Sequence, residues 1–241
     1  MRLHGTRIAW AVEPALRDPI AELLRELPAA EPEEPAELRI IVRSAIGGRG
    51  AWPENARELF FHGQIRGFGA GGDLWLHDGA SSVRIGPGAF EMEAFLAAED
   101  APESTDAVLA VMLFIALVIA LRHRELFHLH AGVVLDPAGR PILIAGDGGS
   151  GKTTSTLALA DAGFAPLADD CVLLARVDGE PRLLAFPKAF HLSATTIAAF
   201  PRLAALVGAT NSVGKRTLDA RLAFAVPSEQ QTRPPSMLLF P

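Results

Sequence analysis

The chain has 241 residues, of which 49% are hydrophobic and 21% charged, and its formal net charge is −6. This length allows one large domain or two small ones, with ample apolar content for a core. The acidic balance and the lack of a long lysine or arginine run argue against nucleic acid as a partner. The single cysteine, Cys171, excludes an internal disulfide, and the polar residues scattered through positions 1–16 are unlike a signal peptide. We therefore expect a cytoplasmic protein.

The first hundred residues predict a small N-terminal domain. Leucines between charged residues indicate an amphipathic helix over 14–27, and an acidic, proline-rich connector follows at 28–37. Alternating apolar residues then predict strands at 38–43, 59–65, 73–77 and 81–85. Asp78 and Gly79 are a turn signal between the last two strands, so a small, mostly antiparallel sheet is favoured. Because no set of catalytic side chains stands out, we expect residues 1–103 to be an accessory or substrate-recognition domain.

The most apolar segment spans residues 108–121. This run of 14 residues is too short to cross a hydrocarbon core of about 30 Å, and basic residues follow it at once. It predicts no membrane span but a helix that is buried on all sides, capped by Ser104 or Thr105 and ending near His123. We expect this helix to begin a second domain over residues 104–241.

A glycine-rich motif at 146–153 follows a short apolar strand at 141–145. Two glycines five residues apart precede a lysine and a threonine. Glycines let backbone N–H groups turn around phosphates, and the helix expected at 153–162 would present the positive end of its dipole. Lys152 would contact the β- and γ-phosphates, and the Thr153 hydroxyl would ligate Mg²⁺. The motif predicts a nucleotide site, and a structural glycine turn is the alternative. The expected nucleotide-binding residues are Gly146, Gly148, Gly149, Ser150, Gly151, Lys152, Thr153 and Thr154.

Predicted hairpins lie on both sides of this loop. The apolar runs 129–135 and 141–145 are joined by a turn of five residues that contains Asp-Pro and Gly. So short a connection makes these strands antiparallel, because a parallel connection needs a dozen or more residues. A second hairpin is expected from 170–176 and 181–186. Ordinary phosphate-loop NTPases carry the loop in a parallel sheet, so the hairpins indicate a different α/β fold with a mixed, α+β sheet.

Two adjacent carboxylates, Asp169 and Asp170, follow the expected helix. In an extended chain they point to opposite faces, so one can reach the reacting phosphoryl group while the other holds metal or a structural partner. Phosphoryl transfer to a hydroxyl needs a base near the γ-phosphate and a carboxylate for Mg²⁺. The alternative is a solvated turn at the start of a strand.

His128 and His130 share one face if their segment is extended, a spacing that is compatible with metal ligation. No cysteine or third histidine at zinc spacing accompanies them. We therefore favour a histidine near phosphates, or one packed in the strand, over a zinc site.

Residues 130–134, 146–153 and 163–170, in this order and near this spacing, resemble the C-terminal catalytic domain of the HPr kinase/phosphorylase family. The resemblance extends more weakly to 214–216. It implies a fold similar to phosphoenolpyruvate carboxykinase, with ATP and Mg²⁺ as cofactors and a serine hydroxyl as the phosphoryl acceptor.

The resemblance also implies roles for single residues. Asp169 would be the general base for the serine hydroxyl, Asp170 would support it or the metal, and His130 would lie beside the pair. Lys152 and Thr153 would hold phosphate and Mg²⁺. The candidate catalytic residues are thus Asp169, Asp170, His130 and Lys152, and the candidate metal ligands are Thr153 and Asp170.

One departure narrows the resemblance. Residues 186–193 lack the glycine cluster and the glutamate that HPr kinases carry after the aspartate pair, which speaks against HPr as substrate and against the reverse phosphorylase reaction. The chain is more similar to divergent HPr-kinase-like serine kinases, including those of lasso-peptide biosynthesis, which phosphorylate a precursor peptide. Lys188, Lys215 and Arg216 would stabilise the transferred group or be surface charges.

We therefore expect an ATP-dependent kinase that acts on a serine of a peptide or protein. A kinase of a small-molecule hydroxyl and a nucleotide-sensing module without turnover are the alternatives. The sequence leaves open whether the protein forms a homo-oligomer. The chain ends on an apolar run that is typical of a beginning strand, where relatives continue further.

Overall fold

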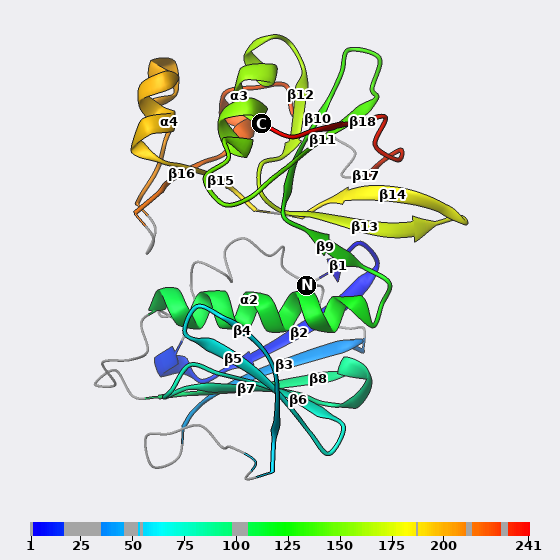
Figure 1. Ribbon diagram of the computed structural model, residues 1–241, viewed down its shortest axis with the longest axis vertical. Helices are drawn as coiled ribbons and strands as arrows, with labels where there is room; N and C mark the ends of the chain where they lie inside the picture. The colour runs from blue at the N-terminus through cyan, green and yellow to red at the C-terminus, as the bar shows by residue number, and fades with distance from the viewer. Residues whose placement is uncertain are drawn as a thin grey trace. The chain divides into compact units, whose positions relative to one another are not determined.

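The structure is a computed structural model that describes residues 2–16, 35–45, 53, 55–97, 106–186, 188–210, 214–227 and 231–241. The chain divides into two compact units, Met1–Arg124 and Glu125–Pro241 (Figure 1). Both units combine β-sheet with few helices, so the chain has a mixed α/β architecture with several sheets, as expected for the α+β class.

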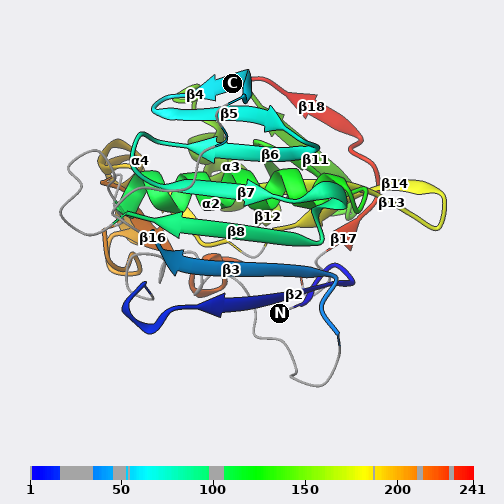
Figure 2. The ribbon, with the colours of Figure 1, turned by 90° about the horizontal axis from the view of Figure 1, so that it is seen from below.

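An eight-stranded sheet forms the body of the first unit. Its strands are β1 (Arg2–Leu3), β2 (Thr6–Val12), β3 (Leu38–Ser44), β4 (Arg57–His62), β5 (Ile65–Ala70), β6 (Asp73–His77), β7 (Ser82–Ile85) and β8 (Glu91–Leu96). Their order across the sheet is β1-β2-β3-β8-β7-β6-β5-β4, and Figure 2 shows this order from β2 to β4. The pairs β2–β3 and β3–β8 are parallel, and the other pairs are antiparallel. The short 3-10 helices η1 (Pro14–Leu16) and η3 (Pro87–Ala89) follow β2 and β7.

The helix α2 (Asp106–Arg122) packs against β6, β7 and β8 of this sheet. One face of α2 is buried through Leu109, Met112, Leu113, Ala116, Leu117, Ala120 and Leu121. The opposite face is only half-buried at Phe114 and Ile119, and Val111 is exposed. The expectation of a helix buried on all sides is therefore wrong. Because α2 covers the N-terminal sheet, the boundary between the units falls after Arg124 and not after residue 103 as expected.

The predicted strands at 38–43, 73–77 and 81–85 are confirmed. The single strand predicted at 59–65 is wrong, because Gly63 turns the chain with a φ of 58° and separates β4 from β5. The sheet is also larger than expected, since β1, β2 and β8 join it. Of the helix predicted at 14–27 only η1 is described, and most of the connector predicted at 28–37 lies outside the described residues.

The second unit contains two four-stranded sheets and one strand pair. Its strands are β9 (Phe127–Leu129), β10 (Ala131–Leu135), β11 (Pro141–Ala145), β12 (Ala165–Ala168), β13 (Val172–Val177), β14 (Glu180–Ala185), β15 (Phe190–Leu192), β16 (Arg216–Leu218), β17 (Gln231–Thr232) and β18 (Met237–Leu239). The sheet orders are β12-β10-β11-β18 and β17-β14-β13-β9, and β15 pairs with β16. The helices are α3 (Lys152–Asp161) and α4 (Ala194–Ala199), with the 3-10 helices η4 (Pro201–Leu203) and η5 (Ala220–Leu222).

Both predicted hairpins are confirmed. β10 and β11 pair antiparallel with Ala131 opposite Ala145, and β13 and β14 pair antiparallel with Val177 opposite Glu180. On its other side β11 pairs parallel with β18, the strand expected near the end of the chain. The strand that leads into the glycine loop therefore has one antiparallel and one parallel neighbour.

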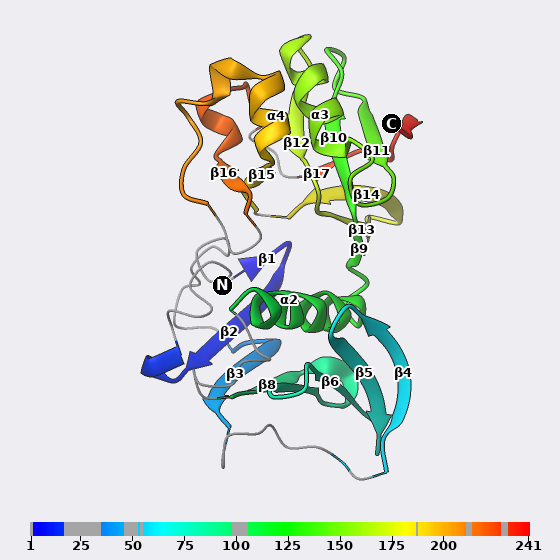
Figure 3. The ribbon, with the colours of Figure 1, turned by 60° about the vertical axis from the view of Figure 1, so that its left-hand side comes forward.

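α3 packs closely on β10, β11 and β12 (Figure 3). A Cβ atom on Gly132 of β10 would lie 2.4 Å from Oγ1 of Thr156, a distance that no side chain tolerates. The hydroxyl of Thr156 is itself bonded within the helix, since it donates to the carbonyl oxygen of Lys152 at 2.9 Å. Glycine at position 132 thus lets the first turns of α3 lie directly against β10.

Candidate functional site

The glycine loop, residues 146–151, connects β11 to α3. Gly149 and Gly151 have φ values of 82° and 100°, a left-handed backbone that strains any residue with a Cβ atom. Gly151 directly precedes α3, so no side chain caps this end of the helix. The first N–H groups of α3 therefore remain available to an anion, which the positive end of the helix dipole also favours.

Lys152 lies inside the curve of this loop. Its side chain is buried, and Nζ donates hydrogen bonds to the carbonyl oxygens of Gly146 at 2.8 Å and Asp147 at 2.9 Å. The ammonium group is thus held within the loop by two neutral acceptors. Phosphate oxygens placed in the loop would be stronger partners for it, because a charged acceptor makes a stronger hydrogen bond.

Asp169 is a buried carboxylic acid at the end of β12, with 3% of its surface exposed. Its Oδ2 accepts a hydrogen bond from the backbone N–H of His191 at 3.2 Å and lies 3.5 Å from the donating hydroxyl of Thr153. Burial, followed by the negative charge of Asp170, raises the pKa of Asp169 to about 7. A carboxyl group that titrates near neutral pH is suited to accept and return a proton.

Asp170 faces different neighbours. Its Oδ2 lies 3.1 Å from Nζ of Lys188, while its Oδ1 is buried and has no hydrogen-bond partner among the described residues. The hydroxyl oxygen of Ser150 in the glycine loop is buried in the same way, again without a partner in the described part of the chain. A buried polar atom left unpaired costs about 1–3 kcal/mol, so both oxygens are poised to bind a ligand.

The two histidines are kept neutral at pH 7. Burial, followed by repulsion from His130 when the His130 ring is protonated, lowers the pKa of His128 to about 4. Burial, followed by the charge of Lys152, lowers the pKa of His130, and Asp170, Lys188 and Lys215 are also near enough to influence it. His130 therefore lies in the same electrostatic environment as the aspartate pair.

Two of the sequence-predicted residues have partners outside this cluster. Thr154 is exposed, and its hydroxyl lies 3.5 Å from that of Thr196 on α4. Arg216 donates to the carbonyl oxygens of Val207 at 2.7 Å and Gly208 at 3.0 Å, so its guanidinium group holds a neighbouring loop. Lys188, in contrast, contacts Asp170 and belongs to the cluster.

Sequence reasoning missed the contribution of His191. Its backbone N–H donates to Asp169, and any residue type except proline carries such a donor. No sequence signal marks it, because the pairing of β15 with β16 sets its position.

The oxygen donors of the cluster fit Mg²⁺, which favours one or two carboxylates together with phosphate oxygens and water. Asp170 offers the unpartnered Oδ1, and Thr153 offers a hydroxyl at the start of α3. Within the described ranges, no group of three or more histidine, cysteine, aspartate or glutamate side chains is placed to hold a metal ion by itself.

No protein-family model and no curated protein sequence matches this chain. The chemistry of the site is therefore inferred from its own residues. Among the helices of the described residues, none combines the length and the apolar character that crossing a membrane requires.

Proposed function

We propose that this chain is an ATP-dependent kinase that transfers the γ-phosphoryl group of ATP to a serine hydroxyl of a peptide or protein. The observation that carries this proposal is Asp169, a buried carboxyl group with a pKa near 7 whose Oδ2 lies 3.5 Å from Oγ1 of Thr153 beside the glycine loop. A module that only held a nucleotide would need no such base, whose burial costs stability at neutral pH.

The fold we propose for the second unit is that of an HPr kinase-like catalytic domain, similar to phosphoenolpyruvate carboxykinase. The antiparallel hairpin of β10 and β11 supports it, because the loop of an ordinary phosphate-loop NTPase leaves a parallel sheet. The motifs resemble divergent HPr-kinase-like serine kinases, which include those of lasso-peptide biosynthesis, so a precursor peptide in the cytoplasm is the acceptor that we favour.

In this proposal the glycine loop binds the phosphates of ATP. The backbone N–H groups of the loop and of the first turn of α3 would surround the β- and γ-phosphates of ATP. Nζ of Lys152 would exchange the carbonyl oxygens of Gly146 and Asp147 for phosphate oxygens, which places a positive charge where negative charge builds up during transfer. The hydroxyl of Ser150 would find a partner there as well.

Thr153 and Asp170 would hold Mg²⁺, which when bound neutralises phosphate charge and orients the γ-phosphoryl group. Asp170 can do so through Oδ1 while its Oδ2 stays paired with Lys188. The two carboxylates thereby have separate roles, one toward the metal and one toward the acceptor.

Transfer itself requires one proton to move. The serine oxygen attacks the γ-phosphorus, the bond from that phosphorus to the bridging oxygen breaks, and ADP leaves with the electron pair. Asp169 accepts the proton of the serine hydroxyl, for which a pKa near 7 leaves a sizeable ionised fraction at neutral pH. His128 and His130, both neutral, add no competing positive charge beside this base.

The experiment that tests this function is labelled phosphoryl transfer from ATP with Mg²⁺ by the full chain. Three acceptor arms are compared: a pool of serine peptides, the same pool with alanine in place of serine, and a panel of small hydroxyl metabolites. Label on the serine peptides alone supports the proposal. Label on a metabolite instead makes the chain a small-molecule kinase, and ATP binding without ADP formation in every arm makes it a nucleotide sensor. Either of these outcomes overturns the proposed function.

A further inference from the structure

A cavity lies at the C-terminal end of α3, the opposite end of this helix from the glycine loop. Its volume is about 500 Å³, within the range of small-ligand sites. The walls come from the end of α3, the start of β12, η4 and the segment after η5. The cavity is therefore built by parts of the second unit that are distant from one another in sequence.

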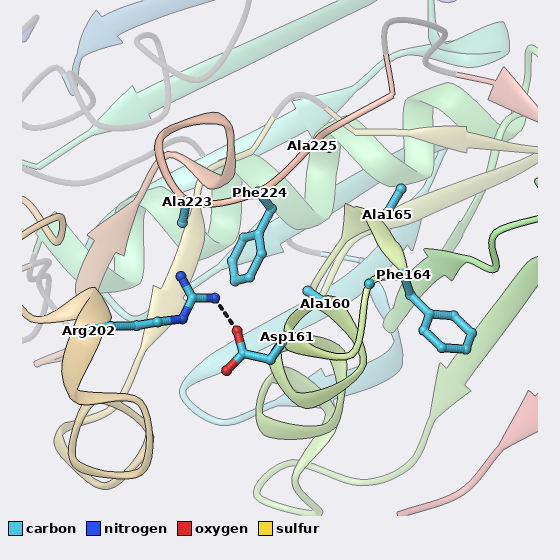
Figure 4. A pocket seen from close by; sticks show the side chains of 9 residues that line it. Ala160, Asp161, Phe164, Ala165, Arg202, Ala223, Phe224 and Ala225 are labelled. Carbon is cyan, nitrogen blue, oxygen red and sulfur yellow. Dashed lines mark hydrogen bonds and ion pairs between the residues drawn. The ribbon is translucent and has the colours of Figure 1, made fainter.

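Seven of the nine residues that line the cavity are alanine, glycine or phenylalanine. The ring of Phe224 lies beside Arg202, the ring of Phe164 points away from this pair, and four alanines contribute only methyl groups (Figure 4). The ring of Phe224 and the alanine methyl groups favour a large apolar side chain, because contact with them removes apolar surface from water.

One ion pair supplies the polar part of the lining. Nη2 of Arg202 donates to Oδ1 of Asp161, and the guanidinium carbon lies 4.8 Å from the ring centroid of Phe224 (Figure 4). The side chains of Arg202 and Asp161 keep 47% and 36% of their surface exposed. Among the described residues, no further hydrogen bond occupies the other guanidinium N–H groups or Oδ2 of Asp161. The pair therefore presents donors and an acceptor side by side.

A donor next to an acceptor complements a peptide group, whose C=O would accept from Arg202 while its N–H donates to Asp161. A ligand with a net charge fits less well, since a carboxylate would meet Asp161 and an ammonium group would meet Arg202. We propose that this cavity anchors the peptide acceptor: it takes a large apolar side chain, and Arg202 and Asp161 hold the adjacent peptide group. This inference rests on the proposed serine kinase function.

The position of the cavity predicts the spacing between anchor and serine. α3 has 10 residues, so the cavity lies about 15 Å along the helix from Lys152. β12 makes the same connection, because Ala165 lines the cavity and Asp169 follows the last residue of the strand. An extended peptide covers about 3.3–3.6 Å per residue. At least about four residues must therefore separate the apolar anchor from the serine.

The test is a set of synthetic peptides that each carry one serine and one phenylalanine, separated by different numbers of residues in an alanine and lysine background. We expect the wild-type chain to show a KM at least about tenfold lower for peptides with four or more intervening residues than for peptides without phenylalanine. Phe224→Ala should remove this preference by raising KM, with kcat retained. Phe61→Ala, which truncates an exposed phenylalanine on β4, is the matched control and should keep the preference.

A second measurement does not depend on turnover. N-acetyl-phenylalanine methylamide should shift the NMR signals of Ala223 and Ala225 in the wild-type chain, whereas free N-acetyl-phenylalanine carboxylate should shift them less. Arg202→Met keeps the apolar walls and should weaken binding of the amide, so it covers the case in which Phe224→Ala does not fold.

The outcomes separate the two proposals. If serine peptides are phosphorylated with the same KM regardless of phenylalanine, or if Phe224→Ala and Arg202→Met leave the preference intact, the anchor cavity is wrong while the kinase function stands. If no peptide is phosphorylated by the wild-type chain, the proposed function fails and the anchoring of a peptide acceptor fails with it. Equal NMR shifts from the amide and the carboxylate would contradict the recognition of a peptide group.

Discussion

Nζ of Lys188 lies 3.1 Å from Oδ2 of Asp170, and its charge also lowers the pKa of Asp169 against the burial that raises it. One side chain thus pairs with the proposed metal ligand and tunes the proposed base. Lys188 is 18 residues from Asp170 in sequence, so the fold alone creates this relationship. We regard Lys188 as a positioning residue for the aspartate pair.

Removal of this charge should change the pH dependence of the reaction. In Lys188→Met the pKa of Asp169 should rise, because the opposing charge is gone, and the acid limb of the kcat/KM profile should move to higher pH. We expect kcat at pH 7 to fall roughly ten- to hundredfold, with partial recovery in Lys188→Arg. The exposed Arg57→Met in β4 is a charge-matched control that should change kcat less than about twofold. An acid limb that stays in place would contradict the role of Lys188.

The close contact between α3 and β10 should be sensitive to one methyl group. In Gly132→Ala the new Cβ atom would lie 2.4 Å from Oγ1 of Thr156 and 3.2 Å from the carbonyl oxygen of Asp169. We expect a loss of about 1–3 kcal/mol in the free energy of unfolding, measured by urea denaturation. Adding Thr156→Ala should recover part of the loss because it removes the nearer atom. Strictly additive effects of the two substitutions would show that this contact is not the cause.

His128 should make the second unit sensitive to acid. Its pKa is lowered from 6.5 to about 4 in the fold, so the unfolded state takes up a proton first as the pH falls. The contribution of neutral His128 to the free energy of unfolding is complete above pH 6.5 and is lost between pH 6.5 and 4. After a discount for its partial exposure, we expect His128→Gln to reduce the loss of stability between pH 7 and 5 by about 1 kcal/mol. The exposed His62→Gln serves as the control for urea denaturation at both pH values, and a reduction of the same size in both variants would refute the role of His128.

Local patterns in the sequence predicted the elements that short-range rules govern. The turn between β10 and β11 is too short for a parallel connection, and Gly151 followed by Lys152 marks the start of α3. The turn at Gly63 could not be predicted in this way, because apolar residues continue on both sides of it and mimic one strand.

Contacts between distant parts of the chain could not be predicted. The apolar residues of α2 surround the helix, so periodicity does not say which face meets a sheet or which unit the helix joins. The pairing of Lys188 with Asp170 and the hydrogen bond from His191 to Asp169 depend on how β15 is placed in the fold. The cavity around Arg202 likewise draws its walls from three separate stretches of the chain, 160–165, Arg202 and 223–225.

Asp169 should lower stability at neutral pH, as a buried base must. Its pKa is raised from 3.8 to about 7, so the fold binds a proton that the unfolded chain releases. The contribution of the protonated Asp169 side chain to the free energy of unfolding is complete below pH 3.8 and is lost as the pH rises through 7. At pH 8, Asp169→Asn should therefore have a free energy of unfolding, measured by urea denaturation, that is higher than that of the wild type by on the order of 1–3 kcal/mol. The difference should be smaller at pH 4. A variant that is less stable at pH 8 would show that burial of this charge is not costly.

Phosphoryl transfer by Asp169→Asn, measured together with ATP binding, tests the central claim most directly. The amide keeps the shape of the side chain but cannot accept the serine proton, whereas the phosphate contacts of Lys152 and the glycine loop remain. We predict a fall in kcat of about 10²–10⁴-fold with the Kd for ATP within about threefold of the wild type, while Asp178→Asn in the β13–β14 turn behaves as wild type. Unchanged transfer to serine by Asp169→Asn would contradict the account.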